Sequence, residues 1–193
     1  MPKSQPPALA RYVTEILTPV VLVSVLLVLQ PVLTPGVTWL QAVVSVFFVT
    51  ALPLLILLRM KRGGLVTDHH VRIRQQRAPV FVMAGTSLGL GTVVLLLLGA
   101  PTALFGEVGA IFLGLVLCLL ANLVWKLSVH SAVAAYVALA LLSPIPHIGV
   151  AAALMLTALV GWSRIELRDH TPAQVMAGQV VGCCVYAASL ILP

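Results

Sequence analysis

The segment Gly-Trp-Ser-Arg-Ile-Glu-Leu-Arg-Asp-His-Thr-Pro-Ala-Gln (residues 161–174) separates two long apolar runs of the chain. Five of its side chains are ionisable and lie within seven consecutive residues, 164–170. The whole chain is 61% hydrophobic and only 8% charged, so this cluster differs sharply from its surroundings. Because ionisable groups are costly to place at a membrane boundary, we interpret the segment as functional.

The apolar runs on both sides of this segment indicate a membrane protein. The chain has 193 residues and a mean hydropathy of +1.13, which is more apolar surface than a soluble domain of this length can bury. Runs of about 20 apolar residues match the thickness of a bilayer core. We therefore predict an all-α, polytopic membrane helix bundle that forms a single domain over residues 1–193 and sits in the lipid bilayer.

Seven apolar runs are candidate membrane spans, at residues 11–33, 37–58, 80–100, 108–125, 129–142, 148–162 and 172–192. The fifth and sixth runs are short for a full crossing, so we expect six or seven transmembrane helices. With seven spans, all eleven Lys and Arg residues fall on one side of the membrane. By the positive-inside rule, that side is cytoplasmic. We therefore predict an integral protein of the cell membrane whose site faces the cytoplasm.

The charge and cysteine content exclude several other classes of protein. Nucleic-acid binding needs a basic face on a soluble domain, whereas the net charge of +6 here comes from short loops between apolar runs. We therefore expect no nucleic-acid partner. All three cysteines lie within apolar runs, so we expect free thiols and no metal site. The first ten residues lack the apolar region of a removable signal peptide.

Small residues recur in the predicted spans. Gly178 and Gly182 form a G-x3-G pattern, which allows two helices to approach closely in lipid. We favour packing within the chain, with a contact between two copies in a homo-oligomer as the alternative.

The first polar cluster covers residues 68–79, between the second and third runs. Arg72, Arg74 and Arg77 offer forked donors that match phosphate oxygens, and His70 lies beside them. The alternative is a solvated loop whose charges only set the membrane topology.

The second cluster contains Lys126, Ser128 and His130. A serine and a histidine two residues apart are a weak pattern by themselves. The alternative is a helix-capping Ser128 beside a histidine at the membrane interface.

The third cluster is the most specific pattern. Ser163-Arg164 is followed by five residues, then His170, and then Gln174 four residues later. Thr171, Pro172 and Gln174 also fit a capping box at the start of a helix. Helices that begin at Pro79, Ser128 and Thr171 would direct three positive dipole ends at one place, which favours an anion site.

In this order the clusters resemble the signatures K-x6-R-P, P-S-G-H and SR-x5-H-x3-D of the type 2 phosphatidic acid phosphatase superfamily. The departures are an inserted residue between Arg77 and Pro79, Leu127 and Val129 in place of Pro and Gly, and Gln174 in place of Asp. Members that resemble glucose-6-phosphatase carry His-x3-Gln at this last point.

The resemblance implies a membrane lipid phosphatase that hydrolyses a polyprenyl or glycerolipid phosphate through a phosphohistidine, without metal or cofactor. His170 would be the nucleophile, His130 the general acid and Gln174 the residue that orients His170, with Glu166 or Asp169 as alternatives for that last role. The remaining implied contacts to phosphate come from Arg164, Ser128 and the first-cluster arginines, with His70 and Ser163 as further candidates. Lys126 is another candidate, which the family pattern does not itself supply.

Two alternatives from other classes remain open. Gln174 and Val129 also suit a catalytically degenerate relative that binds lipid or acts as a scaffold. Asp68 in a cytoplasmic loop suggests a magnesium-dependent prenyl-transferring enzyme, but such enzymes normally have paired Asp-rich motifs. Hydrolysis that survives a chelator would separate the phosphatase from the second alternative.

Overall fold

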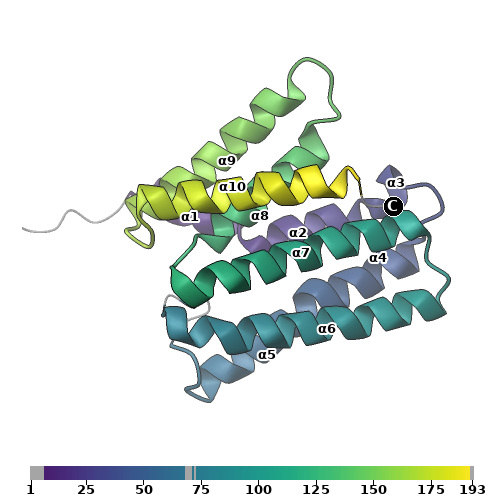
Figure 1. Ribbon diagram of the computed structural model, residues 1–193, viewed down its shortest axis with the longest axis horizontal. Helices are drawn as coiled ribbons and strands as arrows, with labels where there is room; N and C mark the ends of the chain where they lie inside the picture. The colour runs from purple at the N-terminus through teal and green to yellow at the C-terminus, as the bar shows by residue number, and fades with distance from the viewer. Residues whose placement is uncertain (1–6, 68–70, 72, 192–193) are drawn as a thin grey trace, which may run out of the picture.

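The computed structural model describes residues 7–67, 71 and 73–191, and the regular secondary structure in these residues is helical throughout. Figure 1 shows α6, α7 and α10 running side by side in projection, with α9 inclined to them. A π-helical segment (Phe47–Ala51) joins α4 to α5, and a 3-10 turn (Arg74–Gln76) leads into α6. The α-helices are α1 (Ala8–Ile16), α2 (Pro19–Val28), α3 (Gln30–Leu33), α4 (Trp39–Val46), α5 (Leu52–Arg62), α6 (Arg77–Leu97), α7 (Thr102–Val124), α8 (Val129–Leu142), α9 (Gly149–Glu166) and α10 (Pro172–Ser189).

Each predicted apolar run contains helix, which confirms the all-helical membrane class. Four helical stretches are long and apolar enough to cross a bilayer: Trp39–Arg62, Arg74–Leu97, Thr102–Val124 and Gly149–Glu166. A fifth results if α1 and α2, which meet at a bend of 41°, form one span. With 14 residues, α8 is only about 21 Å long, shorter than a bilayer core of about 30 Å. Six or seven spans therefore stay a prediction.

The bend between α1 and α2 has a local cause. Thr18 is the N-cap of α2, where its side chain accepts a hydrogen bond from the Val21 N–H, and Pro19 occupies the first turn. Proline starts a helix well but cannot continue one. α1 instead packs on α9, where Thr14 Oγ1 lies 3.0 Å from Ser163 Oγ.

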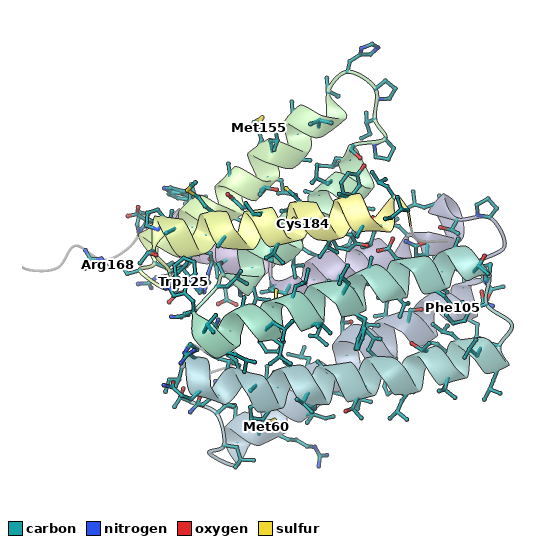
Figure 2. The ribbon with its side chains drawn as sticks, viewed as in Figure 1. Met60, Phe105, Trp125, Met155, Arg168 and Cys184 are labelled. Carbon is teal, nitrogen blue, oxygen red and sulfur yellow. The ribbon has the colours of Figure 1, made fainter. Side chains whose placement is uncertain are left out.

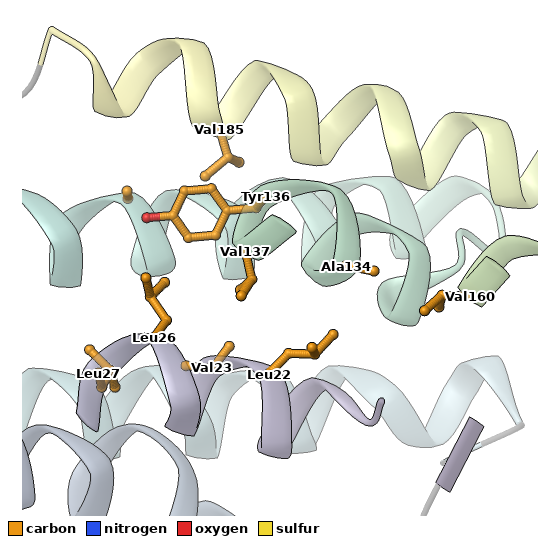
Figure 3. Packing of buried hydrophobic residues seen from close by; sticks show 10 residues of the cluster. Leu22, Val23, Leu26, Leu27, Ala134, Tyr136, Val137, Val160 and Val185 are labelled. Atoms are coloured by element: carbon orange, nitrogen blue, oxygen red, sulfur yellow. The ribbon is translucent and has the colours of Figure 1, made fainter. Parts of the chain in front are cut away.

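The short helix α8 forms the centre of the bundle, between α2, α9 and α10. Figure 3 shows Tyr136 and Val137 of α8 facing Leu22, Val23 and Leu26 of α2 on one side and Val185 of α10 on the other. A helix that is apolar around its whole circumference belongs inside a protein. This explains why α8 does not need the length of a lipid-exposed span.

Contact between α8 and α10 depends on two glycines. A Cβ atom added at Gly178 would overlap the Ser128 carbonyl oxygen, and one added at Gly182 would overlap the Ala132 carbonyl oxygen. Both glycines therefore face α8 of the same chain, which confirms the predicted packing within the chain. The close approach holds the start of α8 beside the start of α10.

Replacing Gly182 by alanine is expected to destabilise the protein by about 1–3 kcal/mol, because a tightly packed contact must open to fit the methyl group. Thermal unfolding of the purified protein in detergent measures the change. The matched control is Gly109→Ala in α7, where an added Cβ meets no atom within 4 Å. Equal melting temperatures for the two variants would contradict the packing argument.

The described residues of the three polar clusters lie at one end of the bundle. In Figure 2, Trp125 and Arg168 are at the same end, whereas Phe105 is at the opposite end. α6, α8 and α10 begin at Arg77, Val129 and Pro172, close to the helix starts expected from the sequence.

Candidate functional site

A cavity of about 380 Å³ brings together residues from all three polar clusters. Arg77, His130, Arg164 and His170 line it. These four side chains are between 2% and 8% exposed, so a bundle that is otherwise apolar holds four buried ionisable groups around one space. The other lining residues are Thr18, Pro19, Val20, Val21, Leu54, Leu57, Val71, Val80, Phe81 and Val129.

The end of α9 places His170 back over Arg164. After the C-cap residue Leu167, Arg168 adopts a left-handed conformation with φ of 57°. The N–H groups of Asp169 and His170 then donate to the Arg164 carbonyl at 3.2 and 3.3 Å. A left-handed conformation costs a non-glycine residue about 1–2 kcal/mol, and here it reverses the chain at the candidate site, where such strain is often found.

The capping box predicted at the start of α10 is confirmed. The Gln174 N–H donates to Thr171 Oγ1 at 3.3 Å, and the Thr171 N–H donates to Gln174 Oε1 at 3.2 Å. The same Oε1 atom lies 3.1 Å from Nδ1 of His170. Because the Thr171 N–H can only donate, this atom of Gln174 must be the oxygen. His170 Nδ1 therefore carries the proton, and the lone pair is on Nε2.

His170 is uncharged at neutral pH in this environment. Burial, followed by the cations Arg77, Lys126 and Arg164, lowers the pKa of His170 from 6.5 to about 3. The hydrogen bond with Gln174 acts in the opposite direction but does not outweigh these effects. A neutral imidazole with a free Nε2 lone pair is a nucleophile.

Asp169 holds Arg164 in position. Its Oδ2 atom lies 2.8 Å from a terminal nitrogen of Arg164, and the two side chains are 6% and 2% exposed. Lys126 Nζ donates to the Asp169 carbonyl oxygen at 2.9 Å, which ties the second cluster to the third. Glu166, the other carboxylate considered for orienting His170, is exposed. Gln174 is the residue hydrogen-bonded to His170 Nδ1.

Ser128 is the N-cap of α8. Helix capping was the alternative interpretation given for Ser128 in the second cluster. Its Oγ accepts from the Ser131 N–H at 3.4 Å, and its own N–H donates to the Gln174 carbonyl at 3.2 Å. Ser128 is fully buried and lies outside the cavity lining. It fixes the start of α8 against the first turn of α10, and His130 and His170 line the same cavity.

Two arginines of the first cluster, Arg74 and Arg77, have different roles in the structure. Arg77 Nε and Nη1 donate to the carbonyls of Val71 and Leu127 at 2.8 and 3.0 Å, and Arg77 also lines the cavity. Arg74 Nη1 instead donates to the carbonyls of Asn122 and Leu123 at 2.9 and 2.8 Å. Arg74 therefore caps the C-terminal end of α7, away from the cavity lining.

The other predicted site residues that the structure describes are not among those that line the cavity. Ser163 donates to the Val160 carbonyl at 2.7 Å and contacts Thr14, so it packs α9 against α1 instead of lining the cavity. His70 and Arg72 lie outside the described residues. The sequence also did not indicate the apolar wall of the cavity or the pairing of Asp169 with Arg164. The sequence feature that could have indicated this pairing is the position of Asp169, a carboxylate among cationic residues and five residues after Arg164.

No family model, curated protein or solved structure matches this chain.

Proposed function

We propose that this chain is a membrane lipid phosphatase that hydrolyses a phosphomonoester or diphosphate of a polyprenyl or glycerolipid through a phosphohistidine. The observation that supports this proposal is the convergence of two histidines and two arginines in one cavity with an apolar wall. Arginines bind phosphate oxygens through paired donors, histidines supply the nucleophile and the acid, and the apolar wall suits the start of a hydrocarbon chain.

In the first step, Nε2 of His170 attacks phosphorus, a P–N bond forms and the P–O bond to the lipid breaks. His130 gives a proton to the departing alkoxide. In the second step, the neutral His130 takes a proton from water, the water oxygen attacks phosphorus, and the P–N bond breaks. Inorganic phosphate leaves, and both histidines return to their starting protonation states. Arg77 and Arg164 stabilise the charge on the nonbridging oxygens in both steps.

The orientation of the site follows from the charge distribution. The eleven Lys and Arg residues of the sequence fall on the side of the clusters when seven spans are assumed, so we propose that the cavity opens toward the cytoplasmic leaflet. Labelling of a cysteine introduced at the exposed Gly64 would then require permeabilised membranes.

The test is phosphate release by detergent-purified protein, in the presence of EDTA, from a panel of polyprenyl and diacylglycerol phosphates. We expect release, together with a phosphoenzyme that is stable in alkali and labile in acid, as a phosphohistidine is. Release that requires magnesium would favour a prenyl-transferring enzyme or another metal-dependent class. Lipid binding without release from any substrate would favour the degenerate relative.

Replacing His130 by alanine is expected to slow the hydrolysis of alkyl phosphates about 10²-fold, because their alkoxide must be protonated as it leaves. Hydrolysis of nitrophenyl phosphate should fall much less, since nitrophenolate leaves without a proton. The ratio of the two rates measures the effect. Equal losses for both substrates would contradict the role of His130 as general acid.

Replacing Gln174 by glutamate is expected to raise turnover about tenfold. A carboxylate of the same length keeps the capping box and gives His170 Nδ1 a charged partner. Charged hydrogen bonds contribute about 1.5–3 kcal/mol against about 1 kcal/mol for neutral ones, and the attacking imidazole gains positive charge.

The same variant changes the pH profile. A negative neighbour raises the pKa of His170 above its value of about 3. The protonated, inactive form then accumulates at a higher pH, so the acid limb of kcat/KM moves upward in Gln174→Glu. The control is Gln75→Glu, which adds the same charge at an exposed residue outside the cavity lining. An unchanged acid limb in Gln174→Glu would show that Gln174 does not orient the nucleophile.

A further inference from the structure

An apolar groove continues from the site cavity into the bundle. It has a volume of about 250 Å³ and shares lining residues with the cavity, among them Pro19, Leu54, Phe81 and Val129. Its lining on α8 extends from Val129 to Tyr136, which is about 10 Å along the helix axis. The groove therefore begins at the wall of the phosphate site and leads away from the cations.

Tyr136 marks the deep end of the groove on α8. Figure 3 shows its ring between Val185 and Leu26, and the side chain is 5% exposed. The Tyr136 hydroxyl donates to Glu107 of α7, and Gln30 Nε2 donates to the other oxygen of Glu107 at 3.5 Å. Packing between Val185 and Leu26 holds the ring, and two hydrogen bonds that link α8, α7 and α3 anchor its hydroxyl. The ring therefore forms the end of an otherwise apolar groove on α8.

The size of the groove limits what can fill it. Its volume of about 250 Å³ is smaller than the roughly 300–1,000 Å³ of pockets that hold drug-sized ligands. A groove of this volume and of about 10 Å in length holds one hydrocarbon chain and leaves little volume for a second.

We propose that the substrate is a one-chain lipid phosphate of which the carbons next to the phosphate occupy this groove, and that Tyr136 limits how many of these carbons the groove holds. The inference rests on the proposed function, because it places the chain of the molecule whose phosphate lies among Arg77, Arg164 and His170. Prenyl and single-acyl phosphates share this chemistry, while a diacylglycerol phosphate does not.

The groove acts by positioning the substrate. Lipid tails are as apolar as the groove, so moving a chain from the bilayer into it gains little hydrophobic free energy. A chain held in the groove, however, fixes the phosphorus atom relative to His170 Nε2. Displacement of a reacting group by about 1 Å can reduce the rate about 10²-fold, so blocking the groove must lower turnover.

Gly114→Leu tests the groove. Gly114 lines it, and a Cβ added there meets only Val185, at 3.6 and 3.9 Å, so the backbone need not move while the leucine side chain fills the space. The matched control is Gly109→Leu in the same helix, which lies outside the groove lining and has no atom within 4 Å of an added Cβ.

The assay compares four phosphate esters with purified full-length protein: a prenyl phosphate, a single-acyl glycerol phosphate, a diacylglycerol phosphate and the short, soluble nitrophenyl phosphate. We expect kcat/KM for both one-chain lipids to exceed that for the diacyl lipid by at least tenfold. Gly114→Leu should reduce the one-chain values at least tenfold and leave nitrophenyl phosphate within twofold of wild type, while Gly109→Leu changes none of them. Faster hydrolysis of the prenyl or of the single-acyl ester shows which of the two kinds of chain the groove prefers.

Tyr136→Ala tests the end of the groove with single-chain alkyl phosphates of graded length. We expect its preferred length to increase, whereas Tyr136→Phe, which keeps the ring and loses only the hydroxyl, should keep the wild-type preference. Equal hydrolysis of one-chain and two-chain lipids with no effect of Gly114→Leu would overturn the groove assignment and leave the phosphatase intact. Failure of the wild-type protein to hydrolyse any of the four esters would overturn both.

Discussion

Replacing His170 by alanine is expected to reduce phosphate release by at least about 10⁴-fold, because removal of a covalent nucleophile leaves only binding and electrostatic stabilisation. The neutral Nε2 of His170 results from its position, since Nδ1 is bound to Gln174 Oε1 at 3.1 Å and the pKa is lowered to about 3. Phosphate release and trapping of the phosphoenzyme measure the loss.

The variant should remain folded, since alanine removes a buried ring that is surrounded by cations and introduces no unpaired charge. His147→Asn is the matched control: His147 is exposed at residues 143–148, between α8 and α9, and asparagine tolerates its positive φ of 65°. A His170→Ala protein that melts normally and still forms a phosphoenzyme would place the nucleophile elsewhere.

Replacing Arg164 by alanine is expected to lower kcat/KM about 10²–10³-fold, because in the proposed mechanism Arg164 supplies positive charge where the phosphoryl group gains negative charge. It should also destabilise the protein by about 3–5 kcal/mol, since the Asp169 carboxylate stays buried after losing this partner. Activity and thermal unfolding report the two effects separately.

Two further variants separate charge from position. Arg164→Lys keeps the charge but loses the forked donors, so it should regain stability more fully than activity. Arg168→Asn removes an equal charge from an exposed residue whose left-handed backbone suits asparagine, and should leave both quantities near wild type. If Arg164→Ala loses stability without loss of activity at permissive temperature, Arg164 is structural and does not contact phosphate.

The membrane class and most of the helices could be predicted because their causes are local. Apolar runs record which segments avoid water, and the capping box formed by Thr171 and Gln174 starts α10 where the sequence predicted. The number of spans is less accessible, because it depends on neighbours. α8 is short and is surrounded by α2, α9 and α10. Its own sequence does not reveal these neighbours.

The sequence also selected most of the ionisable residues of the candidate site, although it did not assign their tasks. Arg74 and Arg77 are three residues apart and chemically identical, yet Arg74 caps α7 and Arg77 lines the cavity. Likewise, Ser128 matched a phosphate-binding position by pattern, and it caps a helix in the structure.

By itself, the sequence determined that this chain is an apolar helical bundle with its basic residues gathered in a few short segments. The tertiary structure alone decided that Arg77, His130, Arg164 and His170 meet in one cavity, and that an apolar groove leads from it to Tyr136. The physical reason is range. Hydropathy and helix caps act over a few residues. The site side chains from different clusters are 34 to 93 positions apart in the sequence, and how the helices that carry them pack sets the distances between them.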